Sequence, residues 1–314
     1  MKFTKPKILI SKCLEFDACR FDGQMINSNY IKKLKNCIDF VTTCPEVEIG
    51  MGTPRKPIRI VEEKNQLLLI QRDSGSDYSS KMNDFSRTYL SDINTIDGFI
   101  LKANSPSCGI NNAKKYLKGN PAPIGKTSGL FASEVINLFP DHPKEDEKRL
   151  NNPFIREFFY TAIFTIADFK SVLSFNSLYK YHAKHKYLFM AFNQVLLKKL
   201  GNIAANKEKL KFEVVCQNYF EILLKLLSKK PRYPSNINSQ MHVMGYFKKD
   251  ISSNEKKHFL EMIELYRQRK VPISSVNSIL SSWIHRFDNQ YLMNQSFLNP
   301  FPAELIEIEN SRFL

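Results

Sequence analysis

Short apolar runs typical of buried β-strands recur in the first half of the chain, and a cysteine follows three of them: Cys13, Cys44 and Cys108. The third run reads Gly-Phe-Ile-Leu-Lys at 98–102 and leads into Ser-Pro-Ser-Cys-Gly at 105–109, where proline and glycine favour a tight turn. Ligands of an open α/β sheet bind beyond the carboxyl ends of its strands. The pattern therefore predicts an α/β domain with a mostly parallel, Rossmann-like sheet and a site at its edge.

The three cysteines would point into one crevice if their strands are parallel neighbours. Structural zinc usually takes four ligands, often from CxxC pairs, and none of the six cysteines belongs to such a pair. A [4Fe–4S] cluster is normally held by four cysteines. With only Cys13, Cys44 and Cys108 as ligands, one iron is left free to act as a Lewis acid. The alternative for each cysteine is a small buried side chain.

The other three cysteines lack this context. We interpret Cys37 as part of a helix core, Cys19 as incidental or as a distant spare ligand, and Cys216 as core of the second half. The N-terminal sequence has no apolar segment followed by a cleavage site, and no stretch approaches the ~18 apolar residues needed to cross a bilayer. We therefore expect a reducing, cytoplasmic setting, in which disulfides are rare. The oligomeric state is left open.

The remaining pattern of the first half alternates strand and helix signals. We expect a hairpin over 58–70, a Lys-rich segment over 113–118, and helices or helix starts over 29–37, 77–92 and 125–139.

A charged segment flanked by prolines, residues 140–157, is the best candidate for a domain boundary. We place an iron–sulfur domain in residues 1–145 and an all-α domain in residues 146–314. Helical spacing dominates beyond the boundary, in residues 154–175, 178–200, 218–227, 255–269 and 276–298.

The second half is also the more basic one. The formal net charge is +15. Residues 151–314 carry 23 Lys and Arg against 13 Asp and Glu, and residues 1–150 carry 23 against 18. Such a surplus favours a polyanionic partner, either nucleic acid or an anionic membrane surface, and on charge alone we prefer nucleic acid. A solubilising, Lys-rich surface is the alternative.

Tyrosine, lysine and arginine interleave in three stretches of the second half, residues 179–187, 229–233 and 246–249, and this mixture offers phosphate neutralisation and stacking surfaces for unpaired bases. The candidate RNA-binding residues are Lys180, Lys184, Lys186, Lys248 and Lys249. A solvated surface is the other interpretation.

Two histidines, His182 and His185, also share one helix face in this region. A metal site would need a further ligand such as His242. We prefer the interpretation that the histidines and their lysine neighbours form a cationic face.

Residues 7–139 resemble the thiouracil desulfidase domain, through the segments Ile-Ser-Lys-Cys-Leu (10–14), Arg-Phe-Asp-Gly (20–23), Cys-Pro-Glu (44–46), Gly-Thr-Pro-Arg (52–55) and Ser-Pro-Ser-Cys-Gly (105–109). Residues 146–314 resemble the helical domain of YbgA-type proteins, through Tyr-His-Ala-Lys-His-Lys (181–186), Gln-Met-His-Val-Met-Gly-Tyr-Phe (240–247) and residues 295–300. The pairing resembles the desulfidases proposed to remove sulfur from 4-thiouridine in tRNA.

The resemblance implies a [4Fe–4S] cluster on Cys13, Cys44 and Cys108, and catalytic roles for Glu46 and Ser105. In that scheme Glu46 deprotonates a water, Ser105 positions it, and hydrosulfide leaves without net electron transfer, so no redox partner is required. The competing interpretations are that Glu46 bonds backbone amides in its turn and that Ser105 caps its loop.

Three further residues are candidates for substrate binding. Ser107 is the competing hydroxyl to Ser105, and Arg55 with Lys56 offers a phosphate site or a stabilised turn. One departure from the family pattern is Leu-Glu-Phe-Asp after Cys13, in which Glu15 and Phe16 alter the rim of the pocket.

Two other functions stay open from the sequence. One is a desulfidase of free thiouracil, and the other is a non-catalytic RNA-binding or redox-sensing protein that carries a cluster.

Overall fold

The computed structural model describes residues 2–93 and 95–306. Two compact units make up this part of the chain. The α/β unit contains Lys5–Ile163 and the segment that starts at Glu304, and the helical unit contains Phe164–Ala303 and residues 2–4. Each unit is described by itself. Within the described residues, no helix is both long and apolar enough to cross a membrane.

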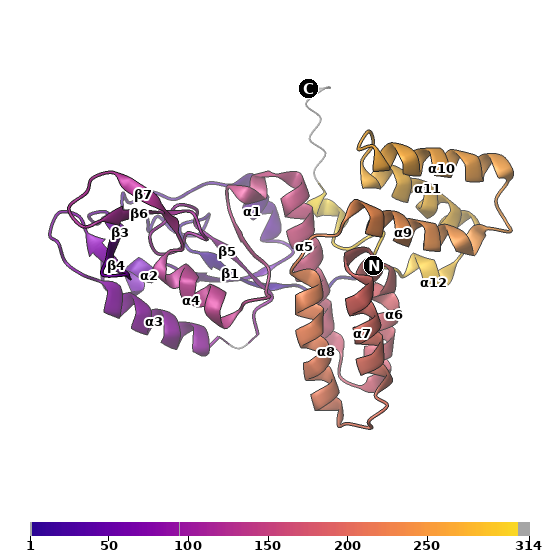
Figure 1. Ribbon diagram of the computed structural model, residues 1–314, viewed down its shortest axis with the longest axis horizontal. Coiled ribbons are helices and arrows are strands. Elements are labelled where there is room, and N and C mark those ends of the chain that lie inside the picture. The colour runs from indigo at the N-terminus through magenta and orange to yellow at the C-terminus, as the bar shows by residue number, and fades with distance from the viewer. Residues whose placement is uncertain (1, 94, 307–314) are drawn as a thin grey trace. The chain divides into compact units, whose positions relative to one another are not determined.

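A four-stranded parallel sheet forms the centre of the α/β unit, in the order β2-β1-β5-β8 (Figure 1). Its strands are β1 (Lys7–Ser11), β2 (Asp39–Thr43), β5 (Gly98–Leu101) and β8 (Lys144–Asp146). The register places Ile8 of β1 opposite Phe40 of β2 and Gly98 of β5. The predicted parallel sheet is confirmed, and its strand ends face one edge.

The sequence of the two central strands explains their position. Ile8, Leu9 and Ile10 in β1 are fully buried, as are Phe99 and Ile100 in β5. Strands that are covered on both faces read as continuous apolar runs, whereas half-exposed strands alternate. These runs therefore specify the middle of the sheet.

A second sheet has the order β4-β3-β6-β7. Its strands are β3 (Ile58–Glu63), β4 (Gln66–Gln71), β6 (Ala113–Leu117) and β7 (Pro123–Thr127). The β3–β4 hairpin is the one expected over 58–70. The β6–β7 hairpin was not predicted. Strand β6 buries only Ala113 and carries two lysines, so its sequence does not show the alternation of apolar and polar residues that marks a strand.

The connections between the strands of the α/β unit contain the helices α1 (Asn29–Leu34), α2 (Pro45–Glu48), α3 (Ser79–Ser91) and α4 (Leu130–Leu138). Helices α3 and α4 lie side by side (Figure 1). Their buried residues Met82 and Phe131 join Leu9 and Ile60 in one core that includes both sheets.

The charged segment 140–157, the candidate domain boundary, is folded into regular structure. It supplies β8, a 3-10 turn at Arg149–Asn151 and the start of α5 (Pro153–Asp168). The acidic residues Glu145, Asp146 and Glu147 are buried in the α/β unit. A high content of charged residues suggests a solvent-exposed segment. It does not show whether the charged side chains find partners inside the fold, as these acidic residues do. The compact units divide within α5, between Ile163 and Phe164.

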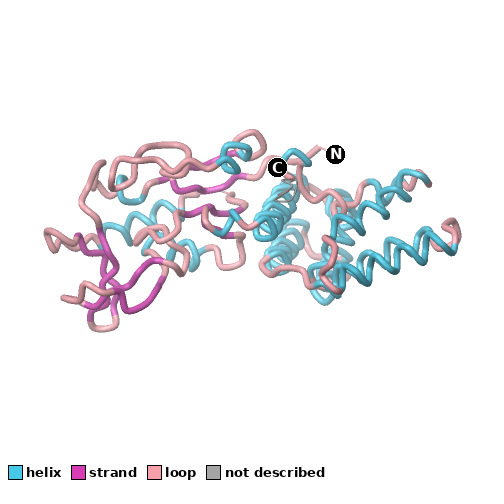
Figure 2. Tube along the Cα trace, turned by 90° about the horizontal axis from the view of Figure 1, so that it is seen from above, coloured by secondary structure: helices cyan, strands magenta, loops and turns pink. Residues whose placement is uncertain are grey.

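The helical unit confirms the all-α class of the second half (Figure 2). Its helices are α6 (Phe175–Phe192), α7 (Gln194–Ala205), α8 (Phe212–Leu227), α9 (Tyr233–Met244), α10 (Ser253–Arg267), α11 (Ile273–Arg286) and α12 (Gln290–Met293). Capping boxes begin α6 at Ser174 and α10 at Ser252, where side chains satisfy the free N–H groups of the first turn.

Candidate active site

A cavity of about 270 Å³ lies at the carboxyl ends of β1, β2 and β5, and it is lined by residues of the α/β unit. Cys13, Cys44 and Cys108 all line it. Cys44 follows β2 directly, Cys13 lies two residues beyond β1, and Cys108 lies on the loop after β5. The structure thus brings together the three cysteines that the sequence placed at one edge of the sheet. Cys19 lines the same cavity.

The thiols differ in acidity. Burial raises the pKa of Cys13 to about 12. Burial also holds the pKa of Cys108 well above its usual value, although a hydrogen bond with Ser11 opposes the shift. A hydrogen bond with Cys19 lowers the pKa of Cys44 to about 7. Because metals bind thiolates, loading a metal group here would release protons from Cys13 and Cys108.

The donor chemistry of the cavity fits an iron–sulfur cluster. Cysteine thiolates are the usual ligands of such clusters. Among the described residues, no three His, Cys, Asp or Glu side chains are grouped to hold one metal ion. A single zinc ion draws every thiolate to ~2.3 Å from one point, whereas the cysteines of a cubane bind separate irons. The cysteine thiols that line the cavity thus match the donor set of an iron–sulfur cluster.

Glu46 lies in α2, two residues after Cys44, and its carboxylate reaches the cavity. Its Oε2 accepts hydrogen bonds from Arg55 Nε at 2.7 Å and Arg55 Nη2 at 2.6 Å. Its Oε1 accepts one from Ser107 Oγ at 2.9 Å. The carboxylate bonds side chains rather than the backbone amides of its turn, and Oε1 keeps a lone pair.

The two serines of the cysteine loop have different roles. Ser105 lines the cavity, and its Oγ accepts the backbone N–H groups of Ser107 and Cys108 at 3.2 and 3.1 Å. Those bonds cap the loop and leave the Ser105 hydroxyl hydrogen to donate. Ser107 is fully buried and donates to Glu46. Ser107 therefore orients the carboxylate, while Ser105 faces the cavity.

Arg55 and Lys56 diverge. The Arg55 side chain is 5% exposed, and besides Glu46 its Nη1 donates to the carbonyl oxygens of Cys19 at 3.0 Å and Gly52 at 2.9 Å. Its guanidinium thus fastens the loops around the cavity. The Lys56 side chain is 71% exposed and lies 3.5 Å from Asp73. Of the two arrangements considered for this pair, the contacts of Arg55 match the stabilised turn.

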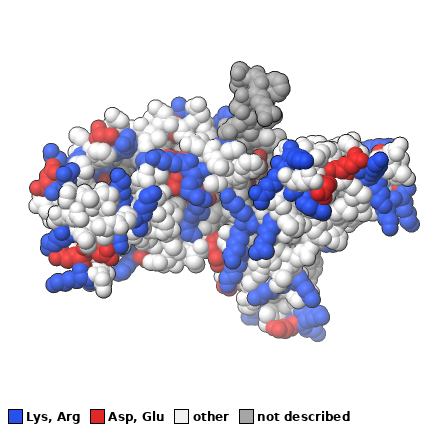
Figure 3. Space-filling model, turned by 45° about the horizontal axis from the view of Figure 1, so that its top comes forward, with Lys and Arg blue, Asp and Glu red and all other residues white. Residues whose placement is uncertain are grey.

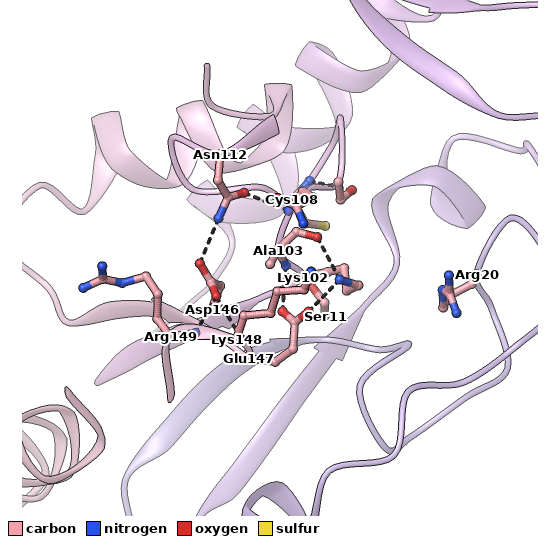
Figure 4. Close-up of polar contacts among 12 residues, drawn as sticks. Ser11, Arg20, Lys102, Ala103, Cys108, Asn112, Asp146, Glu147, Lys148 and Arg149 are labelled. Carbon is pink, nitrogen blue, oxygen red and sulfur yellow. Dashed lines mark hydrogen bonds and ion pairs between the residues drawn. The ribbon is translucent and has the colours of Figure 1, made fainter. Parts of the chain in front are cut away.

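Lys102 is a cavity residue that the sequence reasoning did not select (Figure 4). Its Nζ lies 2.6 Å from Glu147 Oε1 and donates to the Ala103 carbonyl at 2.8 Å. Glu147 Oε2 accepts from the Ala103 N–H at 2.7 Å, and the Lys102 N–H donates to Ser11 Oγ at 2.9 Å. The pair joins β5 to the end of β8. Its signal in the sequence is only a charged residue directly after an apolar run.

Asn112 and Asp146 fasten the other side of the cysteine loop (Figure 4). Asn112 Oδ1 accepts from the Asn104 N–H at 2.8 Å, and its Nδ2 donates to Asp146 Oδ2 at 2.9 Å. Asp146 is 1% exposed. Buried carboxylates without partners are costly, so these bonds explain why the acidic end of β8 sits inside the unit.

The start of α4 also holds the cysteine loop. The N–H groups of Gly129, Leu130 and Ala132 donate to carbonyls of residues 106–109 at 2.8 to 3.1 Å. Gly129 approaches so closely that a Cβ there would lie 2.4 Å from the carbonyl carbon of Ser107. Only glycine fits this approach, and the loop that carries Cys108 is consequently fixed by a helix.

The candidate RNA-binding lysines of the helical unit fall into two groups. Lys180, Lys248 and Lys249 are exposed. Lys184 bonds Asp168 at 2.7 Å, and Lys186 Nζ lies 5.8 Å from the centre of the Tyr187 ring. Figure 3 shows Lys and Arg side chains spread over the face in view, with smaller groups of acidic side chains among them. RNA binding stays a prediction.

The histidines do not form the cationic face preferred from the sequence. His185 is 3% exposed, and its ring nitrogens lie 2.8 Å from Asp168 Oδ2 and 2.7 Å from Ser296 Oγ. His182 Nδ1 lies 2.9 Å from the Tyr219 hydroxyl. Burial lowers the pKa of both histidines. They belong to the core, because Tyr and Asp partners from neighbouring helices satisfy them, and helical spacing alone does not show those partners.

Comparison with known proteins gives matches to two families. The profile of the 2-thiouracil desulfurase family matches residues 8–147. A family described as a protein of unknown function (DUF1722) matches residues 186–302.

Two curated proteins are similar to parts of the chain. The uncharacterized protein YbbK of Bacillus subtilis (strain 168) is 37% identical over 110 residues, which are 32% of this chain and 72% of YbbK. The uncharacterized protein YbgA of Escherichia coli (strain K12) is 25% identical over 143 residues, which are 45% of this chain and 84% of YbgA. A solved structure, the [4Fe-4S]-dependent thiouracil desulfidase TudS, matches with a TM-score of 0.36 and 25% identity over 47% of this chain and 94% of TudS.

Proposed function

Because this chain belongs to the 2-thiouracil desulfurase family, we propose that it is an iron–sulfur-dependent desulfidase that replaces the sulfur of a thiolated uracil with oxygen. The observation that carries the proposal is the cavity in which three cysteines from three adjacent strands surround one space with Glu46 at its wall. Cys13, Cys44 and Cys108 would hold a [4Fe–4S] cluster. When bound, the cluster supplies a Lewis-acidic iron with affinity for a soft thiocarbonyl sulfur.

The side chains of this chain supply the proton chemistry. The reaction takes up one water and releases hydrosulfide, so a base must accept a proton from the attacking water. Glu46 Oε1 has a lone pair for this proton, since Ser107 uses only one. Arg55 fixes the other carboxylate oxygen and keeps Oε1 turned to the cavity. Such positioned bases contribute typically 10²–10⁴-fold to a rate.

Ser105 and Lys102 would orient the nucleobase of the substrate. The Ser105 hydroxyl has two backbone donors on its oxygen, so its own hydrogen is the group left to bind a heteroatom of the ring. The Lys102 ammonium has a third hydrogen besides those on Glu147 and Ala103. The overall change in the substrate is hydrolytic, and no redox partner is needed.

We further propose 4-thiouridine in tRNA as the substrate. The support is the charge of the second half, where 23 Lys and Arg stand against 13 Asp and Glu. The exposed Lys180, Lys248 and Lys249 are the candidate contacts to phosphate.

Free thiouracil is the second candidate substrate. One observation favours it: every residue that lines the cavity belongs to the α/β unit. A free base would therefore meet a complete site without the helical unit. The glutamate at the cavity wall counts against a purely cluster-bearing, non-catalytic protein.

The test is a comparison of three substrates with the full chain reconstituted without oxygen. Bulk tRNA, free 4-thiouridine and free thiouracil are incubated separately, and loss of thionucleoside and release of hydrosulfide are measured. We expect turnover on tRNA to exceed turnover on either small molecule at low salt and to fall steeply as salt rises. Turnover on free thiouracil alone would replace the tRNA proposal. No turnover on any of the three would refute the desulfidase.

A further inference from the structure

The cavity is lined by four thiols rather than three. Cys19 lines it together with Cys13, Cys44 and Cys108, and the residue is only 4% exposed. Its carbonyl oxygen lies 3.7 Å from Cys44 Sγ, so the two cysteines are direct neighbours at the wall of the cavity. Four cysteines are the usual complement of a [4Fe–4S] cluster. Of the six cysteines in the chain, only Cys37 and Cys216 are not among the residues that line this cavity.

The four thiols are supported differently. Cys44 follows a strand directly, Cys13 lies two residues after one, and the Cys108 loop is held by the start of α4. Cys19 belongs instead to the connection between β1 and α1 and is part of no strand or helix. Its backbone is held by a side chain, through the bond of Arg55 to its carbonyl. Strand ends and a helix thus hold the other three thiols, whereas the support of Cys19 is one side chain from another loop.

Resting on the cluster of the proposed function, we propose that Cys19 is a fourth, exchangeable ligand, which binds the remaining iron until the sulfur of the substrate displaces it. The step is a ligand exchange. The Cys19 thiolate leaves the iron and takes up a proton, the thiocarbonyl sulfur takes its place, and nothing is oxidised or reduced. After hydrosulfide leaves, the thiol loses its proton and binds again.

A tethered ligand has two opposite consequences. It completes the coordination of the cluster, so the fourth iron is retained better under oxidants. It also competes with the substrate, because a group held nearby by the chain acts at a high effective concentration. Removing the thiol should therefore make the cluster more labile and, at the same time, lower KM several-fold.

The experiment uses the full chain reconstituted with isotopically enriched iron and read by Mössbauer spectroscopy. We expect four similar sulfur-ligated irons in the natural protein and one distinct iron in Cys19→Ala. Cys19→Ser, which offers an oxygen in the same place, should give a distinct iron that differs from that of the alanine variant. Cys37→Ala is the matched control, since Cys37 is buried in the same unit but bonds Glu304 at 2.7 Å rather than lining the cavity.

A second measurement follows iron content under oxidation. Cys19→Ala should drop from about four to about three irons per chain sooner than the natural protein and Cys37→Ala. Equal iron loss and an already distinct iron in the natural protein would overturn the role of Cys19 and leave the desulfidase standing. A natural protein that takes up no cluster would refute both.

Discussion

Both units of this molecule bury a group of polar side chains. The two groups differ in how much of their hydrogen-bonding capacity is used by partners within the protein. In the helical unit, His185 bonds both Asp168 and Ser296, and Tyr219 bonds His182. In the α/β unit, the cysteines and Glu46 line an open volume of about 270 Å³. The first group is closed by its own partners, while the second leaves donors and acceptors turned to a space.

The contrast shows what separates a structural polar cluster from a reactive one. Both groups are buried, and both hold residues with shifted pKa values. Burial and a shifted pKa are therefore insufficient signs of a site. The distinguishing sign is capacity left after the internal bonds are made, as at Glu46 Oε1 and the Ser105 hydroxyl.

The strongest test removes one of the thiols that line the cavity of the α/β unit. Cys108→Ala should abolish cluster retention and desulfidase activity, because one of the three rigid ligands is lost. Iron content and thionucleoside loss are the measurements. Cys216→Ala is the control, since that cysteine is half-buried in α8 of the helical unit. Full activity in Cys108→Ala would refute the assignment of the cavity.

The next test removes the base without removing a ligand. Glu46→Gln keeps the size of the side chain and an acceptor for Ser107, but it loses the charge that binds Arg55 and the capacity to accept a proton. The rate should fall by about 10²–10⁴, with iron content unchanged. Activity is followed by hydrosulfide release, and Glu48→Gln, on the same short helix but not among the residues that line the cavity, is the matched control. A fall no larger than that of the control would assign Glu46 a purely structural role.

Two glycine substitutions set the units against each other. Gly129→Ala places a methyl group 2.4 Å from the Ser107 backbone, and such overpacking typically costs about 1–3 kcal/mol. Gly201→Ala in α7 meets its nearest atom, His182 Nε2, at 3.8 Å and should instead stabilise the helix by about 0.5–1 kcal/mol. Thermal unfolding and iron retention measure both. Equal effects of the two would contradict the tight approach of α4 to the cysteine loop.

The mildest test weakens the bonds of the buried His185 in the helical unit. Asp168→Asn weakens the bonds to His185 and Lys184 and should lower the local stability of α6 by about 1–3 kcal/mol, with cluster content unchanged. Hydrogen exchange of the α6 amides measures it. Loss of iron in this variant would contradict the separation of the two groups.

The same aspartate predicts a pH dependence for that measurement. Burial raises the pKa of Asp168, but hydrogen bonds from His185 and Lys184 outweigh it and leave the pKa below its usual value. Its contribution is therefore complete above the ordinary Asp pKa of about 3.9 and disappears as the pH falls through the folded value. The natural protein and Asp168→Asn should converge there. A difference between them that persists in strong acid would show that the loss is one of packing.

The sequence predicted the parts of the site that follow from local pattern. Apolar runs ending at a cysteine located Cys13, Cys44 and the Cys108 loop, and the parallel sheet followed from the same runs. Lys102 and Glu147 were missed, because their partnership joins residues 45 apart in the chain. Cys19 was interpreted only as incidental or as a distant spare ligand, since no strand ends directly before it and only the folded loop brings it to the cavity.

The fold shows the same limit. The periodicity of apolar residues predicts hairpin β3–β4 and helices α3 and α4. Strand β8 does not, because its acidic residues are buried against donors that come from distant segments. Ser107 is a related case: its choice over Ser105 as the partner of Glu46 depends on the direction of one side chain in a turn.

The close seating of Gly129 against Ser107 constrains how this protein can diversify. One wall of the cavity is tied to the first turn of α4, so a mutation there must alter a helix and a cysteine ligand together. The lining also contains Phe21, which is 43% exposed and lies on the long connection between β1 and α1. Evolution or design toward bulkier thiolated bases would accordingly proceed through substitutions at Phe21, with the helix-bound wall inherited unchanged.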